Sequence, residues 1–112
     1  MRAIFLDRDG VICYNRADHV KSWAEFQFLP DALAGLAQLA RSEFASVVVT
    51  NQAMINRGLV PADIVSDIHR RMLLAVHRAG GRIDRVIVCP HRPDEGCACR
   101  KPRPGMIFQA AA

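Results

Sequence analysis

The chain has 112 residues, 51% of them hydrophobic and 23% charged, which is the composition of one small folded domain and excludes a disordered segment. Its 15 Lys and Arg residues outnumber its 11 Asp and Glu residues, so the formal net charge is +4. A protein that binds single-stranded nucleic acid needs aromatic residues interleaved with its basic residues, and this chain lacks that pattern. We therefore expect small anionic ligands such as phosphate esters, and no nucleic-acid partner.

The sequence carries no sign of a membrane segment. No apolar stretch approaches the roughly 18 residues of a membrane span. The N-terminus reaches acidic residues by Asp7 and does not resemble a signal peptide. We expect a cytoplasmic monomer without a membrane partner, in which the cysteines are reduced.

The hydrophobic pattern predicts strands and helices that alternate along the chain. Three segments are expected to form strands: the apolar segment 3–6, the β-branched segment 45–49, and the segment 83–88. Three segments that begin at a proline are expected to form helices: Pro30 to Ala40, Pro61 to the Gly80-Gly81 pair, and from Pro104 onward. Residues 13–29 show no sustained helical period and are expected to form a loop.

This order of elements predicts an α/β fold, with a parallel sheet and crossover helices in one domain spanning 1–112. Ligands bind such sheets at the carboxyl ends of the strands. Polar groups follow each predicted strand at that end, and they are Asp7 with Asp9, Thr50 with Asn51, and the segment 89–101. We expect these three segments to converge on one crevice.

The segment Leu6-Asp7-Arg8-Asp9-Gly10 places two carboxylates two residues apart at the end of an apolar strand. Strand alternation predicts that both lie on one side, where like charges repel unless a cation or a phosphate uses them. One carboxylate can attack phosphorus while its neighbour transfers the proton. The alternative is an ordinary Asp-Gly turn.

The loop 89–99 contains a pattern typical of a metal site. Its potential ligands are Cys89, His91, Cys97 and Cys99. A Cys₃His set fills the tetrahedral shell of zinc, which makes a structural site. Reduced, unliganded thiols are the alternative. Cys13 has no such neighbours and is expected to be a small buried hydrophobe.

Two further segments offer groups for binding a phosphoryl oxygen. The Thr50-Asn51-Gln52 turn supplies a hydroxyl, an amide and backbone N–H groups, although a turn or helix cap has the same composition. Lys101 follows the metal loop directly and precedes a proline, which favours a positioned positive charge over a solvated surface run. Arg57 is a weaker candidate for a contact to the substrate.

Together these motifs resemble the haloacid dehalogenase (HAD) superfamily of phosphatases, over residues 3 to about 109. The resemblance is to its zinc-containing, nearly capless branch of heptose 1,7-bisphosphate 7-phosphatases and histidinol-phosphate phosphatases. It implies a three-layer Rossmann-like fold without a cap. It also implies Mg²⁺-dependent hydrolysis of a small phosphorylated metabolite through an aspartyl-phosphate.

The resemblance also implies roles for single residues. Asp7 matches the nucleophile and Asp9 the general acid and base, with Mg²⁺ held by the Asp7 side chain and the Asp9 carbonyl. Lys101 matches the residue that stabilises the phosphoryl charge. The implied substrate contacts are Thr50, Asn51, Arg57 and Arg100, and the implied zinc ligands are Cys89, His91, Cys97 and Cys99.

The segment from Asn51 to Gly58 is more similar to the heptose enzymes than to the histidinol-phosphate enzymes, although Ala53-Met54 replaces their usual Ser-Gly. The family continues with further strands and a Gly-Asp motif that completes the Mg²⁺ site, and no matching motif occurs here. We therefore expect a partial domain in which the strand 3–6 is an open edge. A histidinol-phosphate phosphatase and an inactive, truncated zinc- or phosphate-binding remnant are the alternatives to a heptose-bisphosphate phosphatase.

Overall fold

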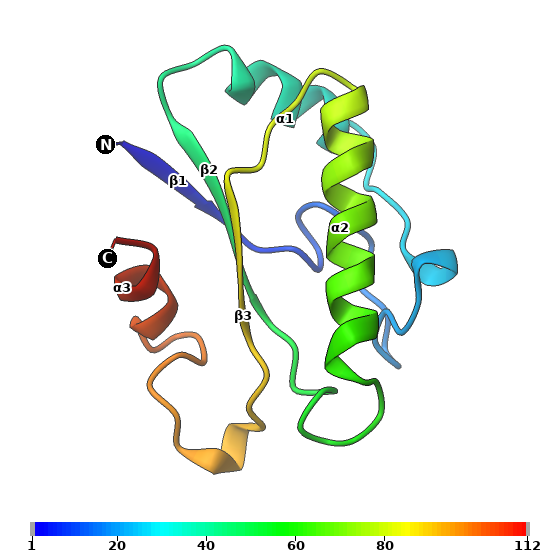
Figure 1. The fold of residues 1–112 in the computed structure, drawn as a ribbon, viewed down its shortest axis with the longest axis vertical. Helices are drawn as coiled ribbons and strands as arrows, with labels where there is room; N and C mark the ends of the chain where they lie inside the picture. The colour runs from blue at the N-terminus through cyan, green and yellow to red at the C-terminus, as the bar shows by residue number, and fades with distance from the viewer. Residues whose placement is uncertain (1, 112) are drawn as a thin grey trace.

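The structure, a computed structural model, describes residues 2–111. Its main elements, in chain order, are β1 (Ala3–Leu6), α1 (Ala32–Ala40), β2 (Ala45–Asn51), α2 (Ala62–Arg78), β3 (Arg85–Cys89) and α3 (Gly105–Ala111). Two short 3-10 turns, η1 (Trp23–Glu25) and η2 (Pro93–Glu95), lie in the loops. Both pairings in the sheet are parallel, in the order β1-β2-β3. The predicted α/β class and parallel sheet are confirmed (Figure 1).

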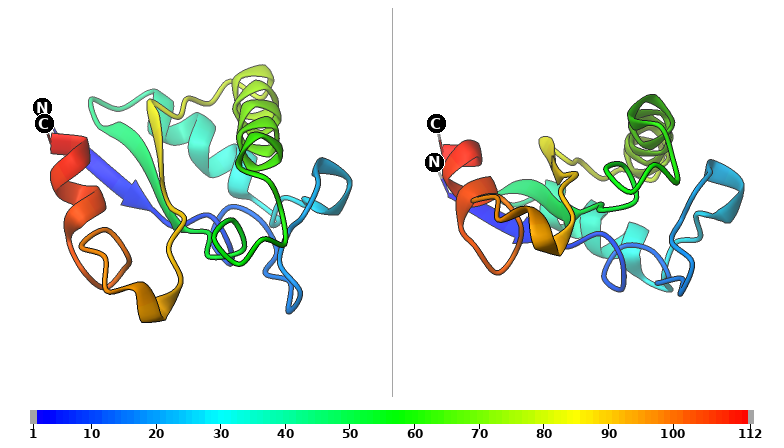
Figure 2. Two further views of the ribbon diagram at one scale, coloured as in Figure 1. Left: turned by 60° about the horizontal axis from the view of Figure 1, so that its bottom comes forward. Right: turned by 90° about the horizontal axis from the view of Figure 1, so that it is seen from below.

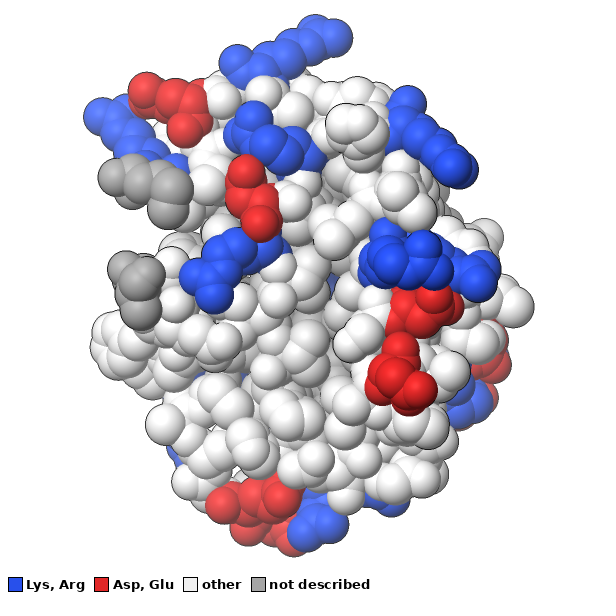
Figure 3. All heavy atoms as spheres, in the orientation of Figure 1, with Lys and Arg blue, Asp and Glu red and all other residues white. Residues whose placement is uncertain are grey.

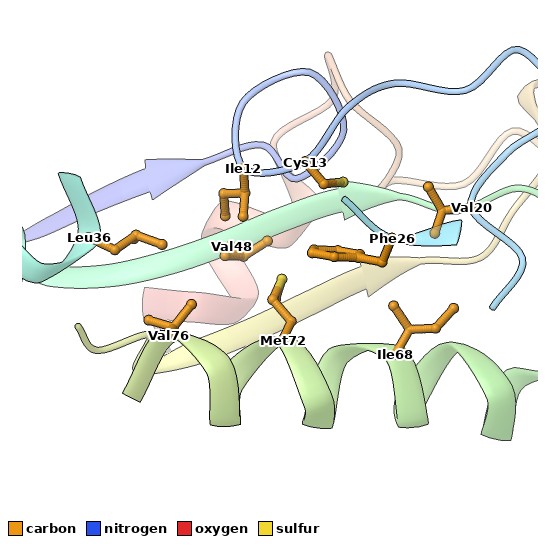
Figure 4. Packing of buried hydrophobic residues seen from close by; sticks show 9 residues of the cluster. All are labelled: Ile12, Cys13, Val20, Phe26, Leu36, Val48, Ile68, Met72 and Val76. Atoms are coloured by element: carbon orange, nitrogen blue, oxygen red, sulfur yellow. The ribbon is translucent and has the colours of Figure 1, made fainter. Parts of the chain in front are cut away.

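Helices cover the sheet on both faces, so the fold has three layers. α3 lies on one side of the sheet and α1 and α2 on the other (Figure 2). Period-two alternation in β2 divides its valines between these faces. Val48 faces the larger core, where it packs with Leu36 of α1 and Met72 of α2 (Figure 4). Val47 and Val49 face α3.

Local sequence signals account for the bounds of α2. Pro61 has extended backbone angles and lies directly before the first helical residue, where its missing N–H costs nothing. Buried apolar residues then recur along one face of the helix and include Val65, Ile68, Met72 and Val76. Gly80 follows with a φ of +86°, a left-handed conformation that ends helices and favours glycine.

Three strand bounds differ from the prediction. β2 extends past Val49 because Thr50 and Asn51 continue the parallel register opposite Val88 and Cys89. β3 begins at Arg85 rather than at residue 83, and it ends at Cys89 rather than at residue 88. Directly before it, Asp84 exchanges hydrogen bonds with Ser46 through its side chain and its backbone N–H. The third strand therefore starts after this anchor.

β1 is an edge of the sheet, because within residues 2–111 it pairs with β2 alone. The expectation of an open edge is therefore confirmed for the described part of the chain. Beside it, an apolar groove of about 420 Å³ runs between the sheet and α3, lined in part by Phe5, Val47 and Ile107. Few charged atoms lie over α3 on the face shown in Figure 3.

The helices of residues 2–111 are too short or too polar to cross a membrane.

Candidate active site

Three segments that are distant in the chain meet at the carboxyl ends of β1 and β2. Asp7 follows β1, and its Oδ1 lies 2.9 Å from the Nζ of Lys101, in the loop between β3 and α3. The same ammonium donates a hydrogen bond of 3.0 Å to the carbonyl oxygen of Val49 in β2. Both side chains stay partly exposed, 46% for Asp7 and 31% for Lys101, so a ligand can reach them. The predicted convergence is confirmed.

Asn51 joins the loop that carries Lys101 to the end of β2 through two hydrogen bonds. The backbone N–H of Lys101 donates to Asn51 Oδ1 at 3.1 Å, and Asn51 Nδ2 donates back to the Lys101 carbonyl at 3.5 Å. This reciprocal pair fixes the backbone from which the ammonium reaches Asp7. Asn51 was predicted to contact the substrate, and the geometry adds a positioning role.

Arg8 sets the orientation of Asp9. Strand alternation does not extend to Asp9, because β1 ends at Leu6 and the chain turns at Gly10, which has a φ of +84°. The Arg8 guanidinium instead donates to Asp9 Oδ1 through Nη2 at 2.7 Å and Nε at 2.9 Å. The Arg8 backbone N–H donates to Asp7 Oδ1 at 2.8 Å. One residue therefore contacts both carboxylates.

Gln52 and Cys13 complete the surroundings of Asp9. Gln52 Nε2 donates to Asp9 Oδ2 at 3.1 Å and to the Thr50 hydroxyl at 2.7 Å, which fixes the amide between them. Cys13 Sγ donates to Asp9 Oδ1 at 3.3 Å. Burial, together with the Asp9 charge, raises the pKa of Cys13 to about 12, although the Arg8 charge acts in the opposite direction. Cys13 is buried as predicted, and it remains a protonated donor.

His69 of α2 contacts the far side of Arg8. Arg8 Nη1 lies 3.1 Å from His69 Nε2, and the ring of Phe26 lies 6.0 Å below the guanidinium carbon. Burial, and then the Arg8 charge, lower the pKa of His69 to about 4. The imidazole is therefore neutral near pH 7.

The four predicted zinc ligands come together. The ligand atoms of Cys89, His91, Cys97 and Cys99 all lie within 4.8 Å of one another. Three sulfurs and one nitrogen at this spacing match the closed tetrahedral shell that zinc takes, in which Zn–S distances are about 2.3 Å. The residues therefore fit zinc. Burial and the neighbouring Cys89 and Cys97 sulfurs raise the pKa of Cys99 to about 12, and a bound cation would reverse that preference.

The loop 89–99, which carries the four candidate zinc ligands and is called the zinc loop below, is packed against α3. Gly105, the first residue of that helix, donates its N–H to the carbonyl oxygen of Ala98 at 2.9 Å. A Cβ at Gly105 would overlap that carbonyl, so the position requires glycine. Lys101 lies between these two fixed points, and the loop and helix therefore limit its movement.

Within residues 2–111, neither Arg57 nor Arg100 forms a side-chain hydrogen bond or an ion pair with Asp7 or Asp9. Arg100 Nη1 donates to the carbonyl oxygen of His91 at 3.2 Å and so contacts the zinc loop. Arg57 is exposed in the loop before α2. Met54, in the Ala53-Met54 pair that departs from Ser-Gly, is fully buried against Val60.

Asp7 and Asp9 offer the oxygen ligands that Mg²⁺ prefers. Within residues 2–111, neither belongs to a group of three or more acidic, His or Cys side chains with clustered ligand atoms. The donor chemistry fits Mg²⁺. The remaining positions of a near-octahedral shell would require oxygens beyond this pair.

Comparison with known proteins finds relatives that match nearly the whole chain, although no protein-family model matches it. It is 43% identical, over 99% of its length, to the D-glycero-β-D-manno-heptose-1,7-bisphosphate 7-phosphatase of Bordetella bronchiseptica. It is 40% identical, over 96% of its length, to the enzyme of that name from Pseudomonas putida. A D-glycero-α-D-manno-heptose-1,7-bisphosphate 7-phosphatase of Mycobacterium tuberculosis is 44% identical over 94% of the chain.

Solved structures of phosphatases are also similar to this chain. The heptose 1,7-bisphosphate phosphatase of B. bronchiseptica, complexed with magnesium and phosphate, superposes with a TM-score of 0.94 at 42% identity over 99% of this chain. A HAD-like phosphatase from Mesorhizobium loti superposes with a TM-score of 0.86 at 30% identity. In sequence and in fold, the chain is therefore similar to phosphatases of the haloacid dehalogenase (HAD) type. It spans 61% and 62% of the length of the Pseudomonas and Bordetella relatives, 56% of the Mycobacterium relative, and 62% and 56% of the two solved chains.

Within this HAD-like fold, the sequence analysis missed the residues that orient Asp9. Arg8, Gln52 and His69 are all buried, with exposed fractions of 0%, 2% and 6%. Of the three, His69 alone carried a signal in the sequence, because it lies at helical spacing from the apolar Val65 and Met72. Nothing in the spacing of His69 indicates that it faces an arginine 61 positions away.

Proposed function

We propose that this chain carries the nucleophile, acid/base and zinc-loop portion of a phosphomonoester hydrolase that removes the 7-phosphate of D-glycero-D-manno-heptose 1,7-bisphosphate. The observation that carries the proposal is the Asp7 carboxylate, held 2.9 Å from the Lys101 ammonium, with both side chains partly exposed. The names of the relatives support the substrate class. Since relatives named for the α and the β anomer are 44% and 43% identical, identity does not select between the anomers.

Asp7 would attack the phosphorus atom and form an aspartyl-phosphate. Its Oδ1 accepts hydrogen bonds from the Arg8 backbone and from Lys101. Within residues 2–111 no hydrogen bond to Oδ2 is formed, so Oδ2 is the oxygen free to attack. The Lys101 ammonium would stabilise the negative charge that develops on the phosphoryl oxygens. Thr50, whose hydroxyl oxygen accepts from Gln52, keeps its own proton to donate to such an oxygen.

Asp9 would transfer the protons. It protonates the alkoxide that leaves when the phosphate ester bond breaks, and it later takes a proton from the water that attacks the aspartyl-phosphate. The second step releases inorganic phosphate and restores the Asp7 carboxylate. The hydrogen bonds from Arg8 and Gln52 hold this carboxylate in one orientation for both steps.

The metals have separate roles in this proposal. Mg²⁺, bound through Asp7 and the Asp9 carbonyl, would neutralise charge on the transferred phosphoryl group. Zinc at Cys89, His91, Cys97 and Cys99 would stiffen the loop that carries Lys101. Because zinc needs thiolates, the proposal places the chain in a reducing compartment such as the cytoplasm. The chain is proposed as a single partial HAD domain.

A second candidate is a domain that binds zinc and phosphate without turnover. The observation in its favour is that no third acidic side chain clusters with Asp7 and Asp9 within residues 2–111. An under-coordinated Mg²⁺ site would bind the cation weakly. Phosphate binding would then persist while hydrolysis is absent.

Phosphate release separates the two candidates. The chain is incubated with Mg²⁺ and, in separate reactions, with the α anomer of heptose 1,7-bisphosphate, the β anomer, and histidinol phosphate. The proposal expects release from a heptose bisphosphate, lost in Asp7→Asn and on chelation of Mg²⁺. Preference for histidinol phosphate would reassign the substrate. If wild type and Asp7→Asn release equal amounts, the enzyme proposal is wrong for this chain, and retained phosphate binding would then favour the second candidate.

A further inference from the structure

We propose that His69 is a positioning residue for Asp9. It accepts a hydrogen bond from Arg8 and so holds the guanidinium that orients the Asp9 carboxylate. The catalytic consequence rests on the proposed function, whereas the contact itself can be tested without activity. His69 touches no reacting atom in this scheme and acts through Arg8.

The direction of the Arg8–His69 hydrogen bond follows from the chemistry of the two groups. A guanidinium has five N–H donors, no acceptor, and a proton that is not lost in proteins. The Arg8 Nη1 atom, 3.1 Å from His69 Nε2, is therefore the donor. His69 Nε2 must carry no hydrogen, so the ring proton is on Nδ1. The opposite tautomer would place two N–H groups against each other inside the protein.

Because Arg8 is buried, its guanidinium needs this hydrogen-bond acceptor. Arg8 is completely buried, and a buried charge is tolerated when its donors are paired. Its donors are divided between Asp9 Oδ1 on one side and His69 on the other, and the Phe26 ring packs at 6.0 Å. His69 is the acceptor on the side away from Asp9.

α2 supplies a rigid support for this acceptor. His69 lies on the buried face of the helix, next to Ile68 and one turn from Val65, both of which are in the core. Gln52 holds the other oxygen of Asp9, at 3.1 Å from Oδ2. The carboxylate is thus fixed from both sides, by a helix through Arg8 and by the end of β2 through Gln52.

The effect of losing His69 should fall on the proton-transfer step. Without the acceptor, Arg8 is free to turn toward another partner, and Asp9 loses the orientation that it needs to protonate the leaving oxygen. Substrate binding depends instead on Lys101 and on Thr50. We therefore expect kcat to fall by a factor on the order of 10² with KM nearly unchanged, as when a catalytic group is displaced slightly.

Nitrogen NMR on the wild-type chain tests the contact directly. The long-range ¹H–¹⁵N spectrum is expected to show His69 as the Nδ1–H tautomer at pH 7, with the Arg8 guanidinium protons protected from exchange. In His69→Leu that protection is lost and the carboxyl carbon signal of Asp9 shifts. His77→Leu, which removes an exposed histidine from the same helix, should leave both signals unchanged. An Nε2–H tautomer, or an Asp9 signal unaffected by His69→Leu, would overturn the proposal.

Kinetics test the consequence. His69→Leu is expected to show the fall in kcat, and His69→Gln, whose side-chain carbonyl can accept from Arg8, should recover most of it. A merely structural role predicts similar losses in both variants, so equal kcat values for the two would refute the positioning role. Circular dichroism confirms that each variant is folded. If the wild-type chain releases no phosphate, the proposed function fails while the NMR result still decides whether His69 orients Arg8 and Asp9.

Discussion

Acidification should destabilise this domain because it protonates the buried side chain of His69. The buried ring is neutral in the folded state because burial, and then the Arg8 charge, lower its pKa from 6.5 to about 4. The unfolded chain binds a proton below pH 6.5, whereas the folded protein resists protonation until about pH 4. Stability from this group is therefore complete above pH 6.5 and is lost as the pH falls toward 4.

The size of the effect follows from the two pKa values. The difference between 6.5 and about 4, at about 1.4 kcal/mol per unit, corresponds to a loss of roughly 3 kcal/mol at the acid end. Roughly 2 kcal/mol of this is already lost at pH 5. Because the ring is 6% exposed, solvent screening does not remove the effect.

Urea unfolding between pH 7 and pH 5 measures this loss. The free energy of unfolding of the wild type should fall by roughly 2 kcal/mol more than that of His69→Gln, which cannot titrate. His77→Gln controls for the loss of an exposed histidine from the same helix and should follow the wild type. Parallel pH profiles for wild type and His69→Gln would show that His69 titrates normally, and the buried contact with Arg8 would be refuted.

Three further predictions concern the zinc loop, Lys101, and the packing of α3 on the sheet. Cys97→Ser should reduce bound zinc well below one ion per chain by elemental analysis, and Cys13→Ser should not; full zinc in Cys97→Ser would contradict the ligand set. Lys101→Met should lower phosphate release by about 10²-fold or more while circular dichroism stays unchanged, and undiminished release would exclude Lys101 from the site. Met106→Ala removes a side chain that is 1% exposed and should cost roughly 2–5 kcal/mol in urea unfolding. Ile107→Ala, 44% exposed, should cost clearly less, and equal costs would argue against the packing of α3 on the sheet.

Much of the fold and part of the site could be predicted from the sequence, because their signals are local. Apolar runs and helical spacing report interactions between near neighbours in the chain, so all three strands and three helices were located. The rule that parallel strands end at one edge then brought Asp7 and Lys101 together correctly. The clustering of the four candidate zinc ligands could be predicted because they lie within eleven positions, Cys89 to Cys99, where spacing alone indicates a shared site.

The tertiary structure decided what surrounds these groups. In the sequence Arg8 only separates two aspartates. In the structure it is completely buried and forms hydrogen bonds with both Asp9 and His69. The end of β2 at Asn51 was set by its register with β3, which no local propensity shows. Sequence patterns determine which elements form and which end of the sheet is polar. The orientation of Asp9 depends on contacts between residues 43 and 61 positions apart, and packing alone creates these.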